Sequence, residues 1–196
     1  RSGKKIVPIM GVVKDTTKKR DVNIPLSSDV NDILDNPEID VVVELMGGVD
    51  EAYKIVTKAL KNKKAVVTAN KALLAYHRYE LRDLAGSTPI GYEASVAGGI
   101  PIIKALREGL SANHIEAIKG IMNGTCNFIL TKMMNEKAEF ADVLKEAQAL
   151  GYAEADPTFD VGGFDAAHKL LILASIAYGI NVKPEEILIE GIENIN

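Results

Sequence analysis

Charged side chains gather in one short stretch of the chain, between residues 151 and 169. The stretch contains one lysine, Lys169. It also contains four carboxylates, which are Glu154, Asp156, Asp160 and Asp165. Acids around a lysine favour its charged form, and a positive donor stabilises an oxygen that gains negative charge. The residue types therefore predict a proton-donating lysine, with further acids able to hold a substrate ammonium group.

An uncharged helical pattern follows directly, from Leu170 to Tyr178. A helix that is apolar on every side is normally buried, and residues four apart share one face. Asp165 and Lys169 would therefore carry charge to the edge of a core, which indicates a site. The sequence leaves a second interpretation open, namely an ordinary Asp–Lys helix pair preceded by a solvated acidic loop.

The first half of the chain alternates short β-branched runs with helical patterns. We expect strands over residues 5–13, 39–45, 65–68 and 89–95, and helices over 29–34, 50–60 and 76–85. In the second helix the inward positions are Ala52, Val56, Ala59 and Leu60. Continuous apolar runs such as Val41 to Val43 suit parallel strands covered on both faces. The pattern predicts an α/β class with an incomplete Rossmann-like nucleotide-binding domain over residues 1–96.

The remaining residues, 97–196, predict an α+β domain for substrate binding and dimerisation. Helices are expected over residues 101–110, 127–135 and 138–150, the last ended by a left-handed Gly151. The core of the middle helix is expected to contain Phe128, Ile129, Met133 and Met134. The partly alternating residues 114–122 and the run 187–195 predict two strands, candidates for pairing with each other. The sheet face left uncovered would be buried by a two-fold partner.

Composition narrows the class of partner and the compartment. A net charge of −4 with scattered lysines offers nothing for nucleic acid to bind. Because no apolar run approaches the ~20 residues that cross a bilayer, we expect no membrane partner. The single cysteine, Cys126, is typical of a reducing compartment, so we expect a cytoplasmic protein. The chain starts at Arg1 and enters an expected strand at once, which suggests an excerpt from a longer chain.

Nucleotide binding has no direct signature in this chain. The glycine pairs at 47–48, 98–99 and 162–163 lack the spacing of the Gly-x-Gly-x-x-Gly turn. The end of a second Rossmann strand distinguishes NAD from NADP with an acid or a base. After residue 13 the chain offers both, with Asp15 beside Lys18, Lys19 and Arg20. The choice between NAD and NADP therefore stays open, and so does a plain solvated turn.

Four blocks occur in one order along the chain: Thr-Ala-Asn-Lys at 68–71, Tyr-Glu-Ala-Ser-Val-Ala-Gly-Gly-Ile-Pro at 92–101, residues 120–130, and residues 151–169. Together they resemble the homoserine dehydrogenase family. The resemblance implies interconversion of L-aspartate 4-semialdehyde and L-homoserine with NADP or NAD, on the route to threonine, methionine and isoleucine. It also implies a homodimer, a glycine-rich strand and helix before Arg1, and further segments after Asn196.

The same resemblance implies roles for individual residues. Lys169 corresponds to the proton donor and Asp165 to its neighbour at the substrate. Glu154 corresponds to the residue that holds the substrate ammonium group, and Asp160 joins it in substrate binding. Lys71 corresponds to a second lysine near both substrate and nicotinamide. The positions that match cofactor contacts are Gly47, Thr68, Lys71 and Gly151.

The block that starts at Glu93 is similar to the family's loop for a monovalent cation, Na⁺ or K⁺. Its ligands would be the Glu93 carboxylate and the backbone carbonyl groups of Val96, Gly98 and Ile100. Hard cations prefer such oxygen ligands. A strand-ending turn before the helix expected at Pro101 is the alternative interpretation.

Three other functions remain open. An acylating semialdehyde dehydrogenase would use Cys126 as nucleophile and would need a base, for which neither His114 nor His168 is clearly placed. A lyase forming a Schiff base on Lys169 would need a neutral amine, which nearby acids oppose. A non-catalytic Rossmann-like regulatory protein would keep the fold without the chemistry.

Overall fold

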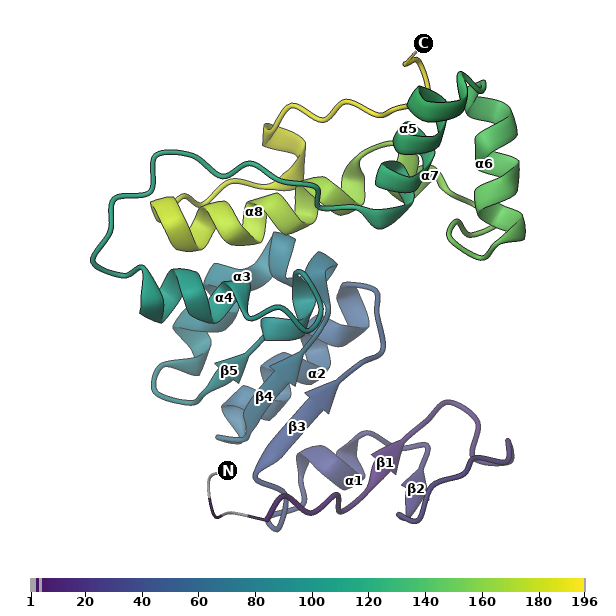
Figure 1. Ribbon diagram of the computed structural model, residues 1–196. Coiled ribbons are helices and arrows are strands. Elements are labelled where there is room, and N and C mark those ends of the chain that lie inside the picture. The colour runs from purple at the N-terminus through teal and green to yellow at the C-terminus, as the bar shows by residue number, and fades with distance from the viewer. Residues whose placement is uncertain (1–2, 4, 196) are drawn as a thin grey trace. The chain divides into compact units, whose positions relative to one another are not determined.

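The computed structural model describes residues 3 and 5–195, and these form two compact units (Figure 1). The first unit runs to Leu73 and includes His77–Tyr92. The second unit consists of Leu74–Tyr76 and the residues from Glu93 onward. We describe each unit by itself.

The first unit contains a parallel sheet of three strands, in the order β3 (Val41–Glu44), β4 (Ala65–Thr68) and β5 (Ile90–Gly91). Helix α2 (Asp50–Lys61) connects β3 to β4, and α3 (Lys71–Ala85) connects β4 to β5. Val42 pairs with Val66, and Val67 with Gly91. Parallel strands joined through helices confirm the predicted α/β class, because such strands need a crossover connection.

Helix α2 forms the centre of the first core. Its four predicted inward residues, Ala52, Val56, Ala59 and Leu60, are fully buried. They belong to one cluster with Val42 and Val66 of the sheet and with Leu34 of the short helix α1 (Asn31–Leu34). The spacing of apolar residues therefore identified the buried face of α2 correctly.

The prediction that both faces of the sheet are covered was wrong, because the face opposite α2 is exposed. Val42 is buried, whereas Val41 is 49% and Val43 is 58% exposed. Val67 of β4 is also exposed. The described residues supply helices that pack on one face only, so a continuous valine run is half exposed here.

Two predicted strands of the first unit are shorter than expected. Of residues 5–13, only β1 (Gly11–Val12) is a strand, and it pairs in parallel with β2 (Leu26–Ser27). Pro8 has no N–H to donate to a ladder, which explains the late start. The strand expected over 89–95 ends with β5, and a 3₁₀ turn, Glu93–Ser95, replaces its second half.

Helix α3 starts five residues earlier than the pattern predicted. The side-chain oxygen of Asn70 accepts a hydrogen bond from the Leu73 amide at 3.0 Å. This cap satisfies one of the free amides at the start of a helix. Lys71 therefore lies in the first turn of α3.

The second unit is built from helices. They are α4 (Ile102–Lys104), which continues as a π-helical turn Ala105–Gly109, then α5 (Gly124–Glu136), α6 (Phe140–Ala149), α7 (Thr158–Val161), α8 (Phe164–Tyr178) and a 3₁₀ turn, Pro184–Glu186. Pro101 directly precedes α4 rather than occupying its first position. Gly151 follows the end of α6 with φ +78°, the left-handed conformation that was predicted.

The core of the second unit contains Ile129 of α5 with Val143 and Ala147 of α6. Phe128 and Met133 pack against it, as predicted. Met134 is 75% exposed, so its prediction as a core residue was wrong. Helix α8 is also less buried than predicted: residues 171–174 are buried, but Leu170 and Tyr178 are exposed. Part of the apolar surface of α8 is therefore left uncovered by the described residues.

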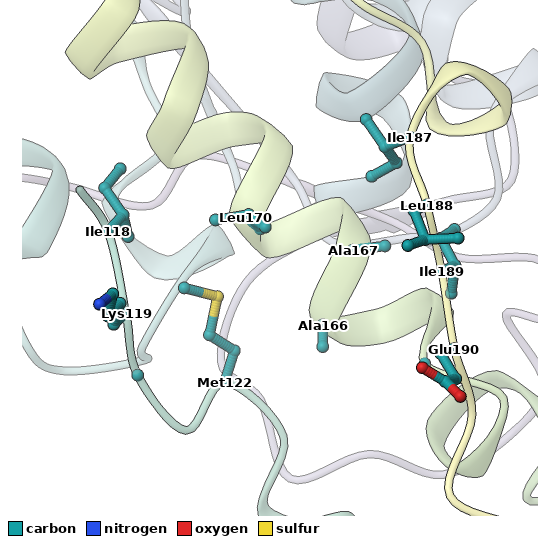
Figure 2. A pocket seen from close by; sticks show the side chains of 12 residues that line it. Ile118, Lys119, Met122, Ala166, Ala167, Leu170, Ile187, Leu188, Ile189 and Glu190 are labelled. Carbon is teal, nitrogen blue, oxygen red and sulfur yellow. The ribbon is translucent and has the colours of Figure 1, made fainter. Parts of the chain in front are cut away.

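The strands predicted at 114–122 and 187–195 do not form among the described residues. Figure 2 shows Ile118 to Met122 on one side of α8 and Ile187 to Glu190 on the other, with Ala166 and Leu170 between them. A groove of about 350 Å³ lies over this part of α8. The two segments cannot reach the ~4.8 Å spacing of paired strands, so neither becomes a strand.

In the described part of the chain, no helix combines the length and the hydropathy needed to cross a membrane.

Gly163 sets the start of α8 and cannot carry a side chain without strain. Its φ is +86°, and an added Cβ would lie 3.0 Å from the carbonyl oxygen of Glu190. We expect Gly163→Ala to destabilise the protein by about 1–3 kcal/mol, measured as a lower thermal midpoint. Gly109→Ala is the matched control, because an added Cβ there meets no atom within 4 Å. Equal midpoints for the two variants would contradict this account.

Candidate active site

Lys169 and Asp165 form an ion pair on the first two turns of α8. The Lys169 Nζ donates to Asp165 Oδ2 at 2.7 Å and to the backbone carbonyl of Met122 at 2.8 Å. Asp165 is only 3% exposed, and Lys169 is half-buried. The predicted pairing on one helix face is therefore confirmed. The bond to Met122 also ties the extended segment 118–122 to α8.

Asn123 connects this pair to a third charged residue, and the sequence had not marked it as a candidate. Its Nδ2 donates to Asp165 Oδ2 at 2.8 Å and to Asp160 Oδ1 at 2.7 Å. Its Oδ1 accepts from the Cys126 amide at 2.7 Å and so caps α5. One amide therefore holds two carboxylates beside Lys169. An Asn placed just before a helix was the available signal, because Asn is a preferred cap.

The loop between α6 and α7 contains the other predicted substrate residues. Glu154 is exposed, and its backbone carbonyl accepts from Gln148 Nε2 at 3.1 Å. Within the described residues no ion pair joins Glu154 to Lys169. Asp156 is used locally, because hydrogen bonds from Thr158 lower its pKa. The structure thus joins Asp165 to Lys169 directly and Asp160 to the same network through Asn123, and it leaves Glu154 and Gly151 on the loop after α6.

Cys126 occupies the first turn of α5 close to this cluster. Its Sγ donates to the backbone carbonyl of Asp160 at 3.2 Å. Burial raises the pKa of the thiol, and the nearby carboxylates of Asp160 and Asp165 raise it further. A cysteine nucleophile needs the opposite shift, toward the thiolate. The site therefore does not favour covalent catalysis by Cys126.

Three predicted cofactor residues of the first unit lie at the carboxyl ends of its strands. Gly47 follows β3, Thr68 ends β4, and Lys71 opens α3. Gly47 and Gly48 both have φ +71°, which glycine adopts without strain. Ligands of open α/β sheets bind at this edge of the sheet. A turn of bare backbone there fits the close approach of a nucleotide.

The predicted cation loop begins with a helix cap. Glu93 Oε1 accepts from the Ile103 amide at 2.8 Å, and Oε2 accepts from the Lys104 amide at 3.0 Å. Each carboxylate oxygen keeps a second lone pair after one such bond. The turn between Glu93 and α4 contains two left-handed residues, Ala97 (φ +60°) and Gly98 (φ +56°). Its carboxylate and carbonyl oxygens fit a hard cation in kind.

Fold and site together define a class. A parallel sheet with crossover helices and a bare glycine turn at its carboxyl edge places the first unit among Rossmann-type nucleotide-binding domains. A family model described as the NAD binding domain of homoserine dehydrogenase matches residues 4–90. A second, described as homoserine dehydrogenase, matches residues 101–196. The chain belongs to the homoserine dehydrogenase family.

Individual relatives agree. The chain is 61% identical over 184 residues to a homoserine dehydrogenase of Helicobacter pylori, which covers 94% of this chain and 44% of the relative. The crystal structure of a homoserine dehydrogenase from Thiobacillus denitrificans matches with a TM-score of 0.91 and 52% identity, over 95% of this chain and 44% of that one. The chain thus spans less than half the length of these relatives.

A solved structure with a cofactor is also similar. A hyperthermophilic archaeal homoserine dehydrogenase in complex with NADPH matches with a TM-score of 0.78 and 34% identity. The match covers 90% of this chain and 54% of that one.

The raised pKa of Cys126 has a measurable consequence. Because less thiolate is present at neutral pH, we expect iodoacetamide to label Cys126 more slowly than glutathione at pH 7, with the rate rising toward pH 9. A time course followed by mass spectrometry measures both. Cys126→Ala should keep turnover within about threefold, since a large loss marks a nucleophile. Faster labelling than glutathione at pH 7 would support the acylating mechanism instead.

Proposed function

We propose that the protein carrying this chain interconverts L-aspartate 4-semialdehyde and L-homoserine with NADP or NAD. The observation that carries the proposal is the cluster of Lys169 with Asp165, Asp160 and Asn123. It occurs in a chain that matches the H. pylori homoserine dehydrogenase over 94% of its length. The archaeal relative with NADPH supports a nicotinamide cofactor.

Lys169 is the proton donor in this proposal. When bound, a reduced nicotinamide would supply a hydride to the aldehyde carbon. The aldehyde oxygen then gains negative charge and takes a proton from the Lys169 ammonium group. A lysine has three N–H donors, of which Asp165 and Met122 take two in the described structure. The third is left to point at the substrate oxygen.

The acids around Lys169 have separate parts. Asp165 accepts from Lys169 and holds its amine in place, because the carboxylate is itself held by Asn123. Glu154 and Asp160 are proposed to bind the substrate ammonium group. Glu154 lies on an exposed loop whose backbone is tied to Gln148, which leaves its carboxylate accessible. A positive substrate group near these acids would be attracted by their charge.

The first unit is proposed to bind the cofactor through Gly47, Thr68 and Lys71, and Gly151 of the second unit is proposed to contribute a further contact. Lys71 is also proposed to contact the substrate. In domain terms, residues 1–96 would hold the nucleotide and residues 97–196 the substrate and the partner subunit. The positions at the carboxyl edge of β3 and β4 support this assignment.

A homodimer in the cytoplasm completes the proposal. The dimer now rests on the resemblance alone, because the sheet face expected to need a partner does not form among the described residues. Sedimentation velocity of the full-length protein measures it. A chain with one cysteine supports a reducing compartment.

Replacing the proton donor gives the central test. We expect Lys169→Ala in the full-length protein to lower kcat by about 10²–10⁴-fold, because proton transfer contributes that much. Cofactor affinity should change less than about threefold, since the residue acts on the substrate oxygen. Absorbance of the reduced nicotinamide, followed with L-homoserine and each cofactor, measures turnover, and fluorescence titration measures affinity.

Lys132 provides the matched control for that variant. It is a partly buried lysine of the same unit, paired with Glu136 and Glu146 away from the cluster. Lys132→Ala should therefore keep normal turnover. A Lys169 variant with normal kcat would remove the assignment of the proton donor.

A monovalent cation at the Glu93 loop is the second testable part. If Na⁺ or K⁺ binds there, activity should rise with either salt relative to choline chloride at the same ionic strength. Glu93→Gln keeps one acceptor oxygen for the α4 amides and should weaken this dependence, because it removes the charged ligand. Equal activity in all three salts would contradict the cation proposal and leave Glu93 as a helix cap.

A further inference from the structure

A buried carboxylate lies at the carboxyl edge of the first sheet, outside the residues assigned so far. Glu44 is the last residue of β3 and is 3% exposed. Its Oε1 accepts from the Met46 amide at 2.8 Å, and its Oε2 accepts from Thr68 Oγ1 at 2.6 Å. Burying a carboxylate is costly unless hydrogen bonds compensate it. A valine at this strand position would avoid that cost, so the carboxylate calls for an explanation.

The hydrogen bonds continue from Thr68 to the start of α3. Thr68 Oγ1 accepts from the Asn70 amide at 3.0 Å. Asn70 Nδ2 donates to the Gly48 carbonyl at 2.6 Å, while its Oδ1 caps α3 through Leu73. One network therefore joins the end of β3, the turn after it, the end of β4 and the first turn of α3.

Every group in this network is adjacent to a proposed cofactor contact. Glu44 and Asn70 together hold both ends of the turn that contains Gly47. Asn70 precedes Lys71 directly. Thr68 is completely buried, and its hydroxyl serves the network. Glu44 is itself too buried to touch a ligand.

We propose that Glu44 is a positioning residue for the nicotinamide cofactor. It fixes the turn 46–48 directly and fixes the start of α3, with Lys71, through Thr68 and Asn70. The inference rests on the proposed function, because it assumes that this edge binds the cofactor. A site held within a fraction of an ångström by such supporting bonds binds more tightly than a loose one.

Glu44→Gln breaks the network at a defined point. Both partners of Glu44 donate, and the Met46 amide can only donate, so the glutamine oxygen must face it. The glutamine NH₂ group then faces Thr68 Oγ1, which already accepts from Asn70 and has one further lone pair. The Thr68 hydroxyl proton loses its acceptor. The variant keeps the size of the side chain while it loosens the link from β3 to α3.

The experiment uses the full-length protein and measures the Kd for NADPH and for NADH by fluorescence titration. We expect Glu44→Gln to weaken binding of the preferred cofactor about tenfold, which is about 1.4 kcal/mol. The KM for the cofactor should rise by a similar factor, with a smaller change in kcat. Thermal midpoints are measured in parallel, and titrations are run where each variant is folded.

Lys64 is the matched control within the same unit. It is 6% exposed, directly precedes β4 at the amino edge, and its Nζ donates to the carbonyl of Ile39 at 2.6 Å and to that of Asn36. Lys64→Met removes the two hydrogen bonds of a buried lysine at the opposite edge of the same sheet. It should lower the thermal midpoint and leave the cofactor Kd within about twofold, because its effect is on stability.

Should Glu44→Gln fail to fold, Asn70→Ser serves as the second variant. Serine still caps α3 but cannot reach the Gly48 carbonyl, so it frees the turn without touching the buried carboxylate. Weaker cofactor binding by this variant would support the same role.

The outcomes separate the inference from the proposed function. Unchanged cofactor affinity in Glu44→Gln, or an equal loss in Lys64→Met, would overturn the positioning role and leave the function standing. A wild-type protein that binds a cofactor but does not oxidise L-homoserine would overturn the function, while the affinity comparison still decides the role of Glu44. A wild-type protein that binds neither cofactor would overturn both.

Discussion

The second unit is organised around one carboxylate that is buried in a helical core. Asp165 is nearly inaccessible, and removing a charge from water costs several kcal/mol unless partners replace the solvent. Lys169 supplies the opposite charge, and Asn123 supplies a further donor. Loss of either partner would remove one of the bonds that compensate Asp165 for the lost solvent. Through these two partners, the buried carboxylate links the start of α8 to the cap of α5 and to the segment that ends at Met122.

The first unit also contains a buried carboxylate that is compensated by hydrogen bonds. Its buried carboxylate, Glu44, accepts from an amide of the following turn and from a threonine on the next strand. In both units an asparagine caps a helix with its oxygen and uses its NH₂ group elsewhere: Asn123 reaches two carboxylates, and Asn70 reaches the Gly48 carbonyl. Because each asparagine bonds both to the first turn of a helix and to a neighbouring segment, it fixes the start of that helix relative to the proposed site. Each proposed site is thus positioned by the same bonds that begin a helix.

Local patterns predicted those elements whose side chains meet their partners through short-range spacing. Helix α2, strand β4, the left-handed Gly151 and the Asp165–Lys169 pair agree with the sequence, because each depends on neighbours within a turn or a strand. The strands expected at 114–122 and 187–195 failed for the opposite reason. A strand exists only if a second segment lies beside it, and here α8 separates the two.

The sequence by itself determined the class of fold, the family and the helix face that presents Lys169. Only the tertiary structure brought Asn123 and Glu44 to residues of the proposed sites, because their partners lie 42 and 24 residues away along the chain. It also raised the pKa of the Cys126 thiol, first by burial and then through the carboxylates of Asp160 on α7 and Asp165 on α8. Residue types and spacing record local geometry, whereas desolvation and long-range hydrogen bonds depend on which segments the fold brings together.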